Sequence, residues 1–352
     1  MKKRGPIDWK GAAARAALLL PPERLHPSVV RWAAARPGSE GWAVALSGGP
    51  DSVALLLLVW AHWPRRRKRL RAFHFDHRIR GAESAADARF CAAACAGLGV
   101  PLLSGTWRAS SAKRAEAQSR DARFAFIERA MAARRMRVLW LGQQQDDIAE
   151  TMLMRVARGS GSAGLAAPRP IHVLAPGRPG GRERIHIRPL LALKKSEIAG
   201  ALREAGARWR VDSSNTNREH FRNRLRKDVI PRWIRASERD ALGGAALSRE
   251  LLEEDDTALE AWVSLLGPVA ADGSLSVAKL AGRPRAVVRR ALHRWLLSQP
   301  RAAKLSRQGF ETLLSAVERG TPFRHSLGSH GFAVIRARKL RFEPLRKSPT
   351  LH

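Results

Sequence analysis

The chain has 352 residues, which is too long for one ordinary hydrophobic core, so we expect two or three domains. Its 64 Lys and Arg residues outnumber its 31 Asp and Glu residues and give a formal net charge of +33. This excess favours a polyanionic partner such as nucleic acid, although an Arg- and Ala-rich composition alone is the alternative explanation. Two cysteines exclude a disulfide scaffold, and the spacing of Cys91 and Cys95 differs from that of metal and redox motifs.

The sequence predicts neither a membrane span nor a secretion signal. The longest apolar run, residues 53–63, is shorter than the about 20 residues that cross a bilayer. The basic, Ala- and Leu-rich segment at residues 1–20 is interrupted by Arg15, and no small-residue cleavage site follows it. We therefore expect a cytoplasmic protein with no membrane contact and an amphipathic helix in this segment.

The N-terminal half alternates between strand and helix patterns. Short apolar runs predict strands at 42–46, 70–75, 102–106 and 138–141, and longer patterns predict helices at 51–63, 82–98, 114–134 and 148–158. Strands separated by helices of this length imply a parallel sheet covered on both faces. The fold class we expect is therefore α/β, with a doubly wound and mostly parallel sheet.

The character of the sequence changes in the C-terminal half. Residues 168–181 are rich in Pro and Gly and predict a loop, and a helix is predicted at 194–205. Further helices are predicted at 248–266, 285–298 and 306–319, before a hairpin at 325–344. We therefore expect a first domain at 1–237 and a smaller helical and α+β region at 238–352.

A glycine-rich loop with serine and aspartate lies between the first predicted strand and the helix that follows it. Its two glycines allow backbone N–H groups to approach phosphate oxygens, and the helix N-terminus adds a partial positive charge. Asp51 would repel phosphate unless Mg²⁺ bridged the two, so the loop predicts a phosphate site that includes Mg²⁺. A plain turn with Asp51 as a helix cap is the alternative. The residues of the loop are Ser47, Gly48, Gly49, Pro50, Asp51 and Ser52.

Polar clusters also follow the second and fourth predicted strands. Ligands of a doubly wound sheet bind beyond the carboxyl ends of its strands, so Asp76, His77 and Arg80 are expected to face the nucleotide. Asp147 and Glu150 are three residues apart and share one helical face. Two carboxylates there could hold the ammonium group of an amine substrate or a metal, and helix capping is the alternative.

Arginines recur in three further segments. Arg123 lies early in a predicted helix, where it could meet phosphate or RNA, and Arg155 and Arg158 suggest a basic element near the crevice. Arg222 and Arg226 share one helical face, which suits them to clamp phosphate or an RNA backbone. An exposed basic helix face is the alternative for each of these segments.

The loop at 47–52 resembles the PP-loop of enzymes that split ATP into AMP and pyrophosphate, which implies an adenine-nucleotide alpha-hydrolase-like fold. The wider set of motifs resembles the tRNA(Ile)-lysidine synthase family, in the family's order, over roughly residues 42–231. The motifs are SGGPDS at 47–52, HFDHRIRG at 74–81, SRDARF at 119–124, DDIAET at 146–151 with RGSG at 158–161, RPLL at 188–191, DSSNTN at 212–217 and FRNRLR at 221–226.

The resemblance implies a reaction in two steps. ATP adenylates the C2 oxygen of the wobble cytidine of an isoleucine tRNA, and the amino group of free L-lysine then displaces AMP to form lysidine. It implies that the loop at 47–52 holds ATP together with Asp76, His77 and Arg80, and that Asp51 carries Mg²⁺. Asp147 and Glu150 would bind lysine, and the C-terminal region would bind tRNA. The residues expected to be catalytic are Asp51, Asp147, Arg222 and Arg226, and those expected to meet tRNA or phosphate are Arg123, Arg155 and Arg158.

Five positions depart from the family's common pattern. Residues 143–145 are Gln-Gln-Gln where histidine is common, and Gln cannot shuttle protons near neutral pH. Ile148 stands where Gln is frequent, and Phe124 stands where Tyr is common, in a chain that has no tyrosine. These changes put a catalytic role for the stretch before Asp146 in doubt.

Two other functions remain as alternatives. A tRNA thiolase would need paired cysteines near the site, for which Cys91 and Cys95 have unsuitable spacing. A basic RNA-binding protein without catalysis is disfavoured by Asp51, Asp147 and Glu150, because acidic groups in a phosphate crevice weaken simple RNA binding. The sequence leaves monomer and dimer equally open.

Overall fold

The computed structural model describes residues 5, 7–76, 82–107, 116–175, 182–211, 221–299 and 305–345. The chain forms two compact units, Met1–Leu251 and Leu252–His352, which are treated separately below. The division falls within the long helix α11 (Ala241–Leu266), beyond residue 237, where the sequence analysis ends the first domain. Among the helices of the described residues, none is long and apolar enough to cross a bilayer.

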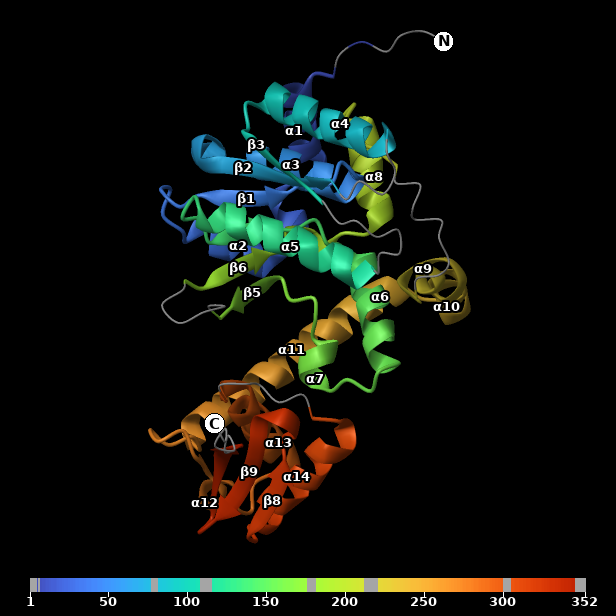
Figure 1. Ribbon diagram of the computed structural model, residues 1–352. Helices are drawn as coiled ribbons and strands as arrows, with labels where there is room; N and C mark the ends of the chain where they lie inside the picture. The colour runs from blue at the N-terminus through green and yellow to red at the C-terminus, as the bar shows by residue number, and fades with distance from the viewer. Residues whose placement is uncertain are drawn as a thin grey trace. The chain divides into compact units, whose positions relative to one another are not determined.

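The first unit is built on a six-stranded sheet (Figure 1) with the strand order β3-β2-β1-β4-β6-β5. Adjacent strands are parallel except for β5, which pairs antiparallel with β6 at the edge. The order runs outward from β1 in both directions, which confirms the expected doubly wound, mostly parallel sheet. The strands are β1 (Trp42–Ala45), β2 (Leu70–Asp76), β3 (Leu102–Thr106), β4 (Val138–Trp140), β5 (Ile171–Leu174) and β6 (Arg184–Ile187).

Helices cover both faces of this sheet. The main apolar core lies between the sheet and α1 (Trp9–Leu19), α3 (Pro50–His62), α4 (Ala82–Leu98) and α8 (Lys195–Glu204). Side chains of α3 are buried on all sides from Ser52 to Trp60, as expected of a helix that is apolar all round. A second core lies under α5 (Glu116–Ala132), where Ile127 and Met131 pack on Phe73 and Leu139.

Among the remaining helices of the first unit, α6 follows the carboxyl end of β4 and η3 follows that of β6. Helix α6 packs against the short α9 and the π-helical turn η5, and a small apolar cluster including Ile148 and Ile230 joins α6 to α10 and α11. The bounds are α2 (Pro27–Ala34), α6 (Gln145–Val156), α7 (Ser162–Leu165), η3 (Pro189–Ala192), α9 (Phe221–Arg224), η5 (Leu225–Val229) and α10 (Ile230–Ser237).

The second unit is a four-stranded antiparallel sheet packed against helices, with the strand order β7-β10-β9-β8. Ser306 caps α14 as expected, since its hydroxyl accepts a hydrogen bond from the Gly309 N–H at 3.1 Å. The predicted hairpin is confirmed as β9 and β10. The elements are β7 (Leu275–Ser276), α12 (Val277–Leu280), α13 (Arg285–Ser298), α14 (Arg307–Arg319), β8 (Phe323–Ser326), β9 (Gly331–Arg336) and β10 (Lys339–Pro344).

Several elements differ from the sequence-based expectation, among them strand β6, which was not predicted, and α6, which begins at Gln145 rather than at 148. The edge strand β5 lies inside the segment 168–181 that was predicted to be a loop, because four residues beside a Pro- and Gly-rich stretch carry too weak a period to stand out. Helix α11 begins at Ala241 rather than at 248. Gly243 and Gly244 hide its first turns in the sequence, and the Asp240 carboxylate stabilises this end by accepting a hydrogen bond from the Gly243 N–H at 3.0 Å.

Candidate active site

The loop after β1 is held in shape by its own serines. The Ser52 hydroxyl lies 3.0 Å from the Ser47 hydroxyl, accepts from the Ser47 N–H at 3.1 Å and donates to the Gly49 carbonyl at 3.0 Å. Gly48 has φ +87°, a backbone conformation that a side chain would strain. The loop therefore presents its backbone at the N-terminus of α3, in the arrangement that binds phosphate.

The loop after β4 touches the loop after β1 through a glycine. A Cβ placed on Gly142 would lie 2.9 Å from the Asp51 carbonyl oxygen and 3.1 Å from the Ser52 nitrogen. Strand β1 and strand β4 are neighbours where the strand order reverses, which is where doubly wound sheets bind ligands. The sequence analysis did not single out Gly142, although a glycine at the end of a strand is the usual sign of close backbone approach.

Asp51 lies half-buried in the first turn of α3. Its Oδ1 atom is buried and has no hydrogen-bond partner among the residues that the structure describes. Burial raises the pKa of this carboxyl to about 7, with the nearby charge of Asp147 as the next cause. A divalent cation would satisfy such an oxygen. No group of three or more His, Cys, Asp or Glu side chains suited to a metal occurs in the described residues, so Mg²⁺ would need phosphate and water ligands as well.

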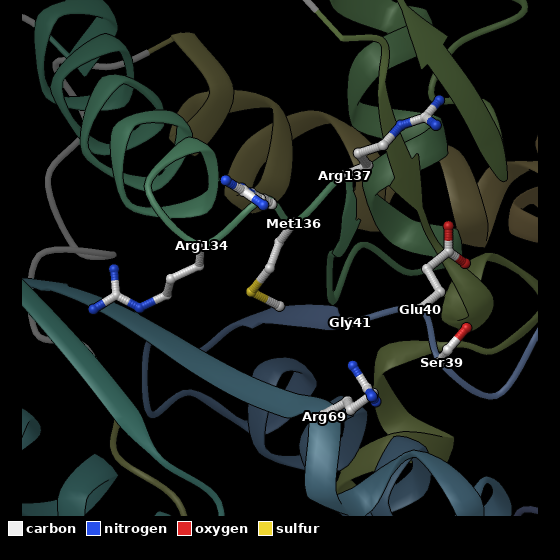
Figure 2. Close-up of a pocket in the computed structure, with 8 residues that line it drawn as sticks. Ser39, Glu40, Gly41, Arg69, Arg134, Met136 and Arg137 are labelled. Carbon is white, nitrogen blue, oxygen red and sulfur yellow. The ribbon is translucent and has the colours of Figure 1, made fainter.

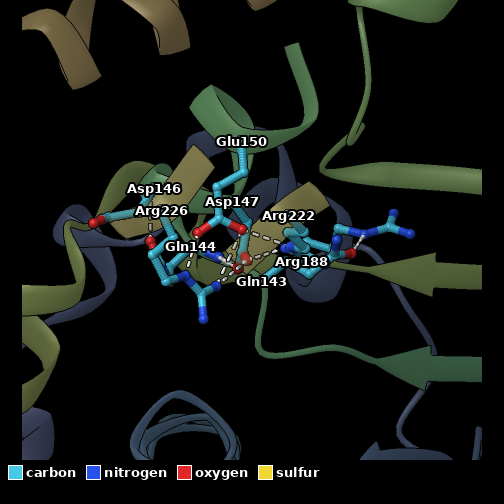
Figure 3. A network of polar contacts seen from close by, with 8 residues as sticks. All are labelled: Gln143, Gln144, Asp146, Asp147, Glu150, Arg188, Arg222 and Arg226. Atoms are coloured by element: carbon cyan, nitrogen blue, oxygen red, sulfur yellow. Dashed lines mark hydrogen bonds and ion pairs between the residues drawn. The ribbon is translucent and has the colours of Figure 1, made fainter. Parts of the chain in front are cut away.

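Four of the predicted site residues form one cluster of ion pairs, which we call the site cluster: Asp147 and Glu150 on α6, and Arg222 and Arg226 on α9 and η5 (Figure 3). Arg222 donates from Nε to Glu150 at 2.6 Å and from Nη2 to Asp147 at 2.5 Å. Arg226 donates to Glu150 from Nε at 2.6 Å and from Nη2 at 3.1 Å. Each carboxylate is therefore bonded to at least one guanidinium.

The glutamines before α6 support this cluster. Gln144 caps the helix: its N–H donates to Asp147 at 3.0 Å, and its side-chain oxygen accepts from the Asp146 N–H at 2.5 Å. Asp146 in turn accepts from the Lys195 N–H at 3.0 Å, and Gln143 accepts from Arg188. Gln143 and Gln144 therefore fix the start of α6 by hydrogen bonds.

Further arginines gather beside the cluster on α5, α6 and the end of β6. Burial lowers the pKa of Arg123, with Arg120 and Arg222 as further causes, and lowers that of Arg155, with Arg120 and Arg158 contributing. Burial also lowers the pKa of Arg188 to about 10, again with a contribution from Arg120. Crowded, partly buried positive charges of this kind favour a bound anion.

The sequence analysis quoted Arg120 and Arg188 within the motifs SRDARF and RPLL but gave no individual role to these two arginines, which link this group. Arg120 lies three residues before Arg123, on the same helical face, and Arg188 directly follows the carboxyl end of β6. Both positions could have been found by asking which arginines the parallel sheet brings to its carboxyl edge. Next to them Phe124 stacks on His186, with ring centroids 5.8 Å apart, and burial followed by Arg188 lowers the pKa of His186 to about 3.

The other predicted residues are less informative in the structure. Asp76 lies at the carboxyl end of β2, the strand beside β1, and Arg158 is exposed beyond the end of α6. His77 and Arg80 lie outside the described residues, as does the DSSNTN motif at 212–217. Their expected roles stay predictions.

A family model described as a PP-loop domain matches residues 26–233. The chain belongs to the PP-loop family. Membership implies the use of ATP, and the matched range contains the whole sheet of the first unit and the site cluster.

Curated relatives match this PP-loop protein over part of its length. A tRNA(Ile)-lysidine synthase of Symbiobacterium thermophilum is 36% identical over 241 residues, which are 67% of this chain and 48% of that protein. Those of Geobacter sulfurreducens and Bacillus subtilis are 36% and 34% identical over 64% and 62% of this chain, and over 46% and 45% of their own length. The matches confirm the resemblance, and the chain spans about half the length of the curated relatives it matches.

A solved structure shares the fold of the PP-loop unit. A U34-tRNA thiolase of Methanococcus maripaludis aligns with a TM-score of 0.50 over 70% of this chain and 79% of that one, at 16% identity. In this chain Cys91 lies behind the PP-loop, with its Sγ 3.3 Å from where a Cβ on Gly48 would be. Cys91 and Cys95 are buried, and burial is the main cause that raises the pKa of both thiols to about 12. Neither is suited to act as a thiolate near neutral pH.

A pocket lies at the amino ends of the parallel strands, at the opposite end of the sheet from the PP-loop. Its residues precede β1, β2 and β4, so it opens at the amino ends of the parallel strands and has no part in the candidate site. Figure 2 shows this pocket, whose volume is about 270 Å³ and whose lining residues are Ser39, Glu40, Gly41, Arg69, Arg134, Arg135, Met136 and Arg137.

Proposed function

We propose that this PP-loop protein ligates free L-lysine to C2 of the wobble cytidine of an isoleucine tRNA, using ATP and releasing AMP and pyrophosphate. The observation that carries the proposal is the site at the carboxyl edge of the sheet: a phosphate loop, the unpartnered Asp51 oxygen and the site cluster lie together there. The similarity to tRNA(Ile)-lysidine synthases supports the choice of substrates.

In the first step the O2 atom of the cytosine attacks the α-phosphorus of ATP, and the bond from that phosphorus to pyrophosphate breaks. Backbone N–H groups of the loop at 47–52 bind the polyphosphate, and arginines of the site stabilise the charge that develops on the leaving pyrophosphate. Asp51 would hold Mg²⁺, which would neutralise phosphate charge when bound. Asp76, His77 and Arg80 complete the proposed nucleotide contacts.

In the second step the lysine amine forms a bond to C2, the bond from C2 to the oxygen carried by AMP breaks, and the nitrogen loses a proton. Asp147 and Glu150 bind an ammonium group of lysine, because buried carboxylates attract a cation strongly. Breaking this bond is easier than expelling oxide from cytosine, since AMP is a far better leaving group. The chain therefore activates the base before the amine reacts.

The tRNA is bound through the positive charge of the chain. Arg123, Arg155 and Arg158 contact phosphates near the anticodon loop, whose bases can be splayed out of the stack. The C-terminal region at 238–352 provides a further tRNA contact. We place the protein in the cytoplasm, away from membranes, as monomer or dimer. Thiolase chemistry is disfavoured by the buried, protonated Cys91 and Cys95.

Incorporation of labelled lysine into bulk tRNA by the purified protein, with ATP and Mg²⁺, tests this function. Label that appears with the wild type and is lost in Asp51→Ala and Asp147→Ala supports it. If no label appears but tRNA-dependent exchange between ATP and pyrophosphate continues, adenylation stands and lysine is the wrong substrate. If folded protein does neither, the non-catalytic RNA-binding alternative replaces the proposal.

A further inference from the structure

The carboxylates proposed to hold lysine are already neutralised by the protein itself. Asp147 and Glu150 carry two negative charges, and Arg222 and Arg226 carry two positive charges at 2.5 to 2.6 Å from them. The four side chains therefore sum to no net charge. The ammonium group of lysine would need the positions beside these carboxylates, and the two guanidinium groups already lie there.

Burial makes this competition strong. Glu150 is 1% exposed and Asp147 is 8% exposed, so water screens their interactions with the arginines little. A buried carboxylate that loses its partner is strongly destabilised, so neither arginine can leave unless another cation takes its place. An incoming ammonium must therefore replace a guanidinium, and the guanidinium that leaves must find another anion.

The neighbouring PP-loop is where such an anion would bind. The Asp51 carboxyl, in the first turn after the loop, is within electrostatic range of both Asp147 and Arg226. The two arginines project from α9 and the π-helical turn η5, while Leu225 between them and Ile230 after them are buried and anchor the segment. The guanidinium ends of long side chains can move from carboxylate to phosphate while this backbone stays helical, but the segment then loses the ion pairs that hold it to α6.

We propose that the site cluster couples the binding of polyphosphate to the binding of the amine. The triphosphate of ATP draws Arg222 and Arg226 away from Asp147 and Glu150, and the carboxylates then accept the ammonium of lysine. The proposal rests on the proposed function for the identity of the amine. It makes the two arginines positioning residues that hold the amine site closed until the nucleotide is present, and so orders binding with ATP before lysine.

Calorimetric titration of the full chain with L-lysine, with and without Mg²⁺ and the ATP analogue AMPCPP, whose methylene bridge prevents cleavage, tests the coupling. We expect AMPCPP to tighten lysine binding by about tenfold or more, within the usual range of coupling between two sites. The same titration with L-norleucine, which lacks the side-chain ammonium, should show no such gain. Arg222→Gln and Arg226→Gln should bind lysine without AMPCPP, whereas Arg235→Gln, an exposed arginine of α10, should behave as the wild type.

A second measurement does not depend on variants or on lysine. Hydrogen exchange of the amides at 221–229 should rise when AMPCPP and Mg²⁺ are added, because the arginines lose their carboxylate partners. Equal lysine affinity with and without AMPCPP, in protein that transfers lysine to tRNA, would overturn the coupling and leave the proposed function intact. Faster exchange at 221–229 without lysine binding would support release of the arginines and reject lysine, and with it the proposed function.

Discussion

Two clusters of the same composition, one in each unit, have different surroundings. The site cluster joins two acids of α6 to two arginines of α9 and η5. In the second unit, Asp256 and Glu260 of α11 join Arg290 and Arg294 of α13, and the Arg290 Nη1 atom lies 2.9 Å from Glu260. We call this set the second-unit cluster. Pairing geometry and residue types alone do not separate the two.

What separates the clusters is their neighbours. The second-unit cluster borders an apolar core that includes Val263 and Val287, and the side chains of Glu260 and Arg294 are each 42% exposed. The site cluster adjoins the PP-loop and the unpartnered Asp51 oxygen. The second-unit cluster holds two helices together, whereas the charges of the site cluster can be rearranged by a ligand. In this chain, the unsatisfied Asp51 oxygen beside the site cluster is what marks it as a candidate site.

The largest expected effect of a single change is on lysine transfer. Asp147→Asn keeps the shape of the side chain and removes the charge that holds the ammonium, so we expect kcat/KM for lysine to fall by about 10²–10³-fold. The matched change in the other cluster, Asp256→Asn, should leave transfer by the folded protein nearly unchanged. Steady-state assays measure kcat/KM for lysine in both variants. Equal losses would show that the site cluster has no special role in lysine transfer.

A smaller loss should follow from changing the glycine that links the two loops. In Gly142→Ala the new methyl group would lie 2.9 Å from the Asp51 carbonyl oxygen and push the PP-loop away from α6. A displacement of about 1 Å at such a point costs about 10²-fold in rate. Gly38→Ala is the control, because nothing lies within 4 Å of its Cβ. Measuring kcat of both variants tests the expected loss. Full activity of Gly142→Ala would show that the protein accommodates the methyl group without moving the reacting groups.

The second-unit cluster should affect stability rather than chemistry. Arg290→Ala removes an ion-pair partner of the Asp256 side chain, which is 3% exposed, so we expect the free energy of unfolding to fall by up to about 5 kcal/mol. Urea denaturation followed by circular dichroism measures this loss. Arg336→Ala, which removes an exposed pair, should change stability little. Affinity for AMPCPP should be the same in all three proteins, and a loss of affinity in Arg290→Ala would assign the second-unit cluster to the site.

The smallest effect is expected at the two cysteines. Cys91→Ala and Cys95→Ala remove small buried side chains whose thiols are protonated near neutral pH, so lysine transfer should be little changed. Measuring transfer and urea stability together separates a packing loss from a chemical one. Abolished activity in a stable Cys91→Ala protein would revive sulfur chemistry as an alternative.

Local patterns were enough to predict the elements that build the site. The strand, glycine-rich loop and helix around Asp51 are consecutive in the chain, and the spacing of Asp147 and Glu150 fixes their common face on α6. The parallel sheet followed from the alternation of strands and helices. The loop and the shared helical face depend on residues within one or two turns of one another, which is the range over which sequence periodicity is reliable. The sheet follows from the order of the predicted strands and helices along the chain.

The contacts between distant segments could not be read in this way. Arg222 lies more than seventy residues from the acids it bonds, and nothing in either segment alone pairs them. The sequence analysis assigned Arg222 and Arg226 to phosphate and Asp147 and Glu150 to lysine, as separate sets. Only the fold shows that the two arginines form ion pairs with the two acids. Arg120 and Arg188 were given no individual role for the same reason, since their proximity arises from α5 and β6 meeting across the sheet.

The π-helical turn after α9 sets the directions in which the side chains of residues 225–229 point. A π turn holds one residue more than an α turn, so Arg226 and the buried Ile230 that follows are set at angles that an ordinary helix would not give them. Removing one residue between 225 and 229 would convert the turn to 3.6 residues per turn, and the helix beyond the deletion would keep nearly its orientation, because a π turn accommodates one extra residue within itself. The π turn therefore lets the chain carry one residue more between the buried Leu225 and Ile230 than an α-helix would allow with both side chains buried on one side. A deletion within 225–229 is expected to change which side chains face the acids of α6 while leaving α10 in place.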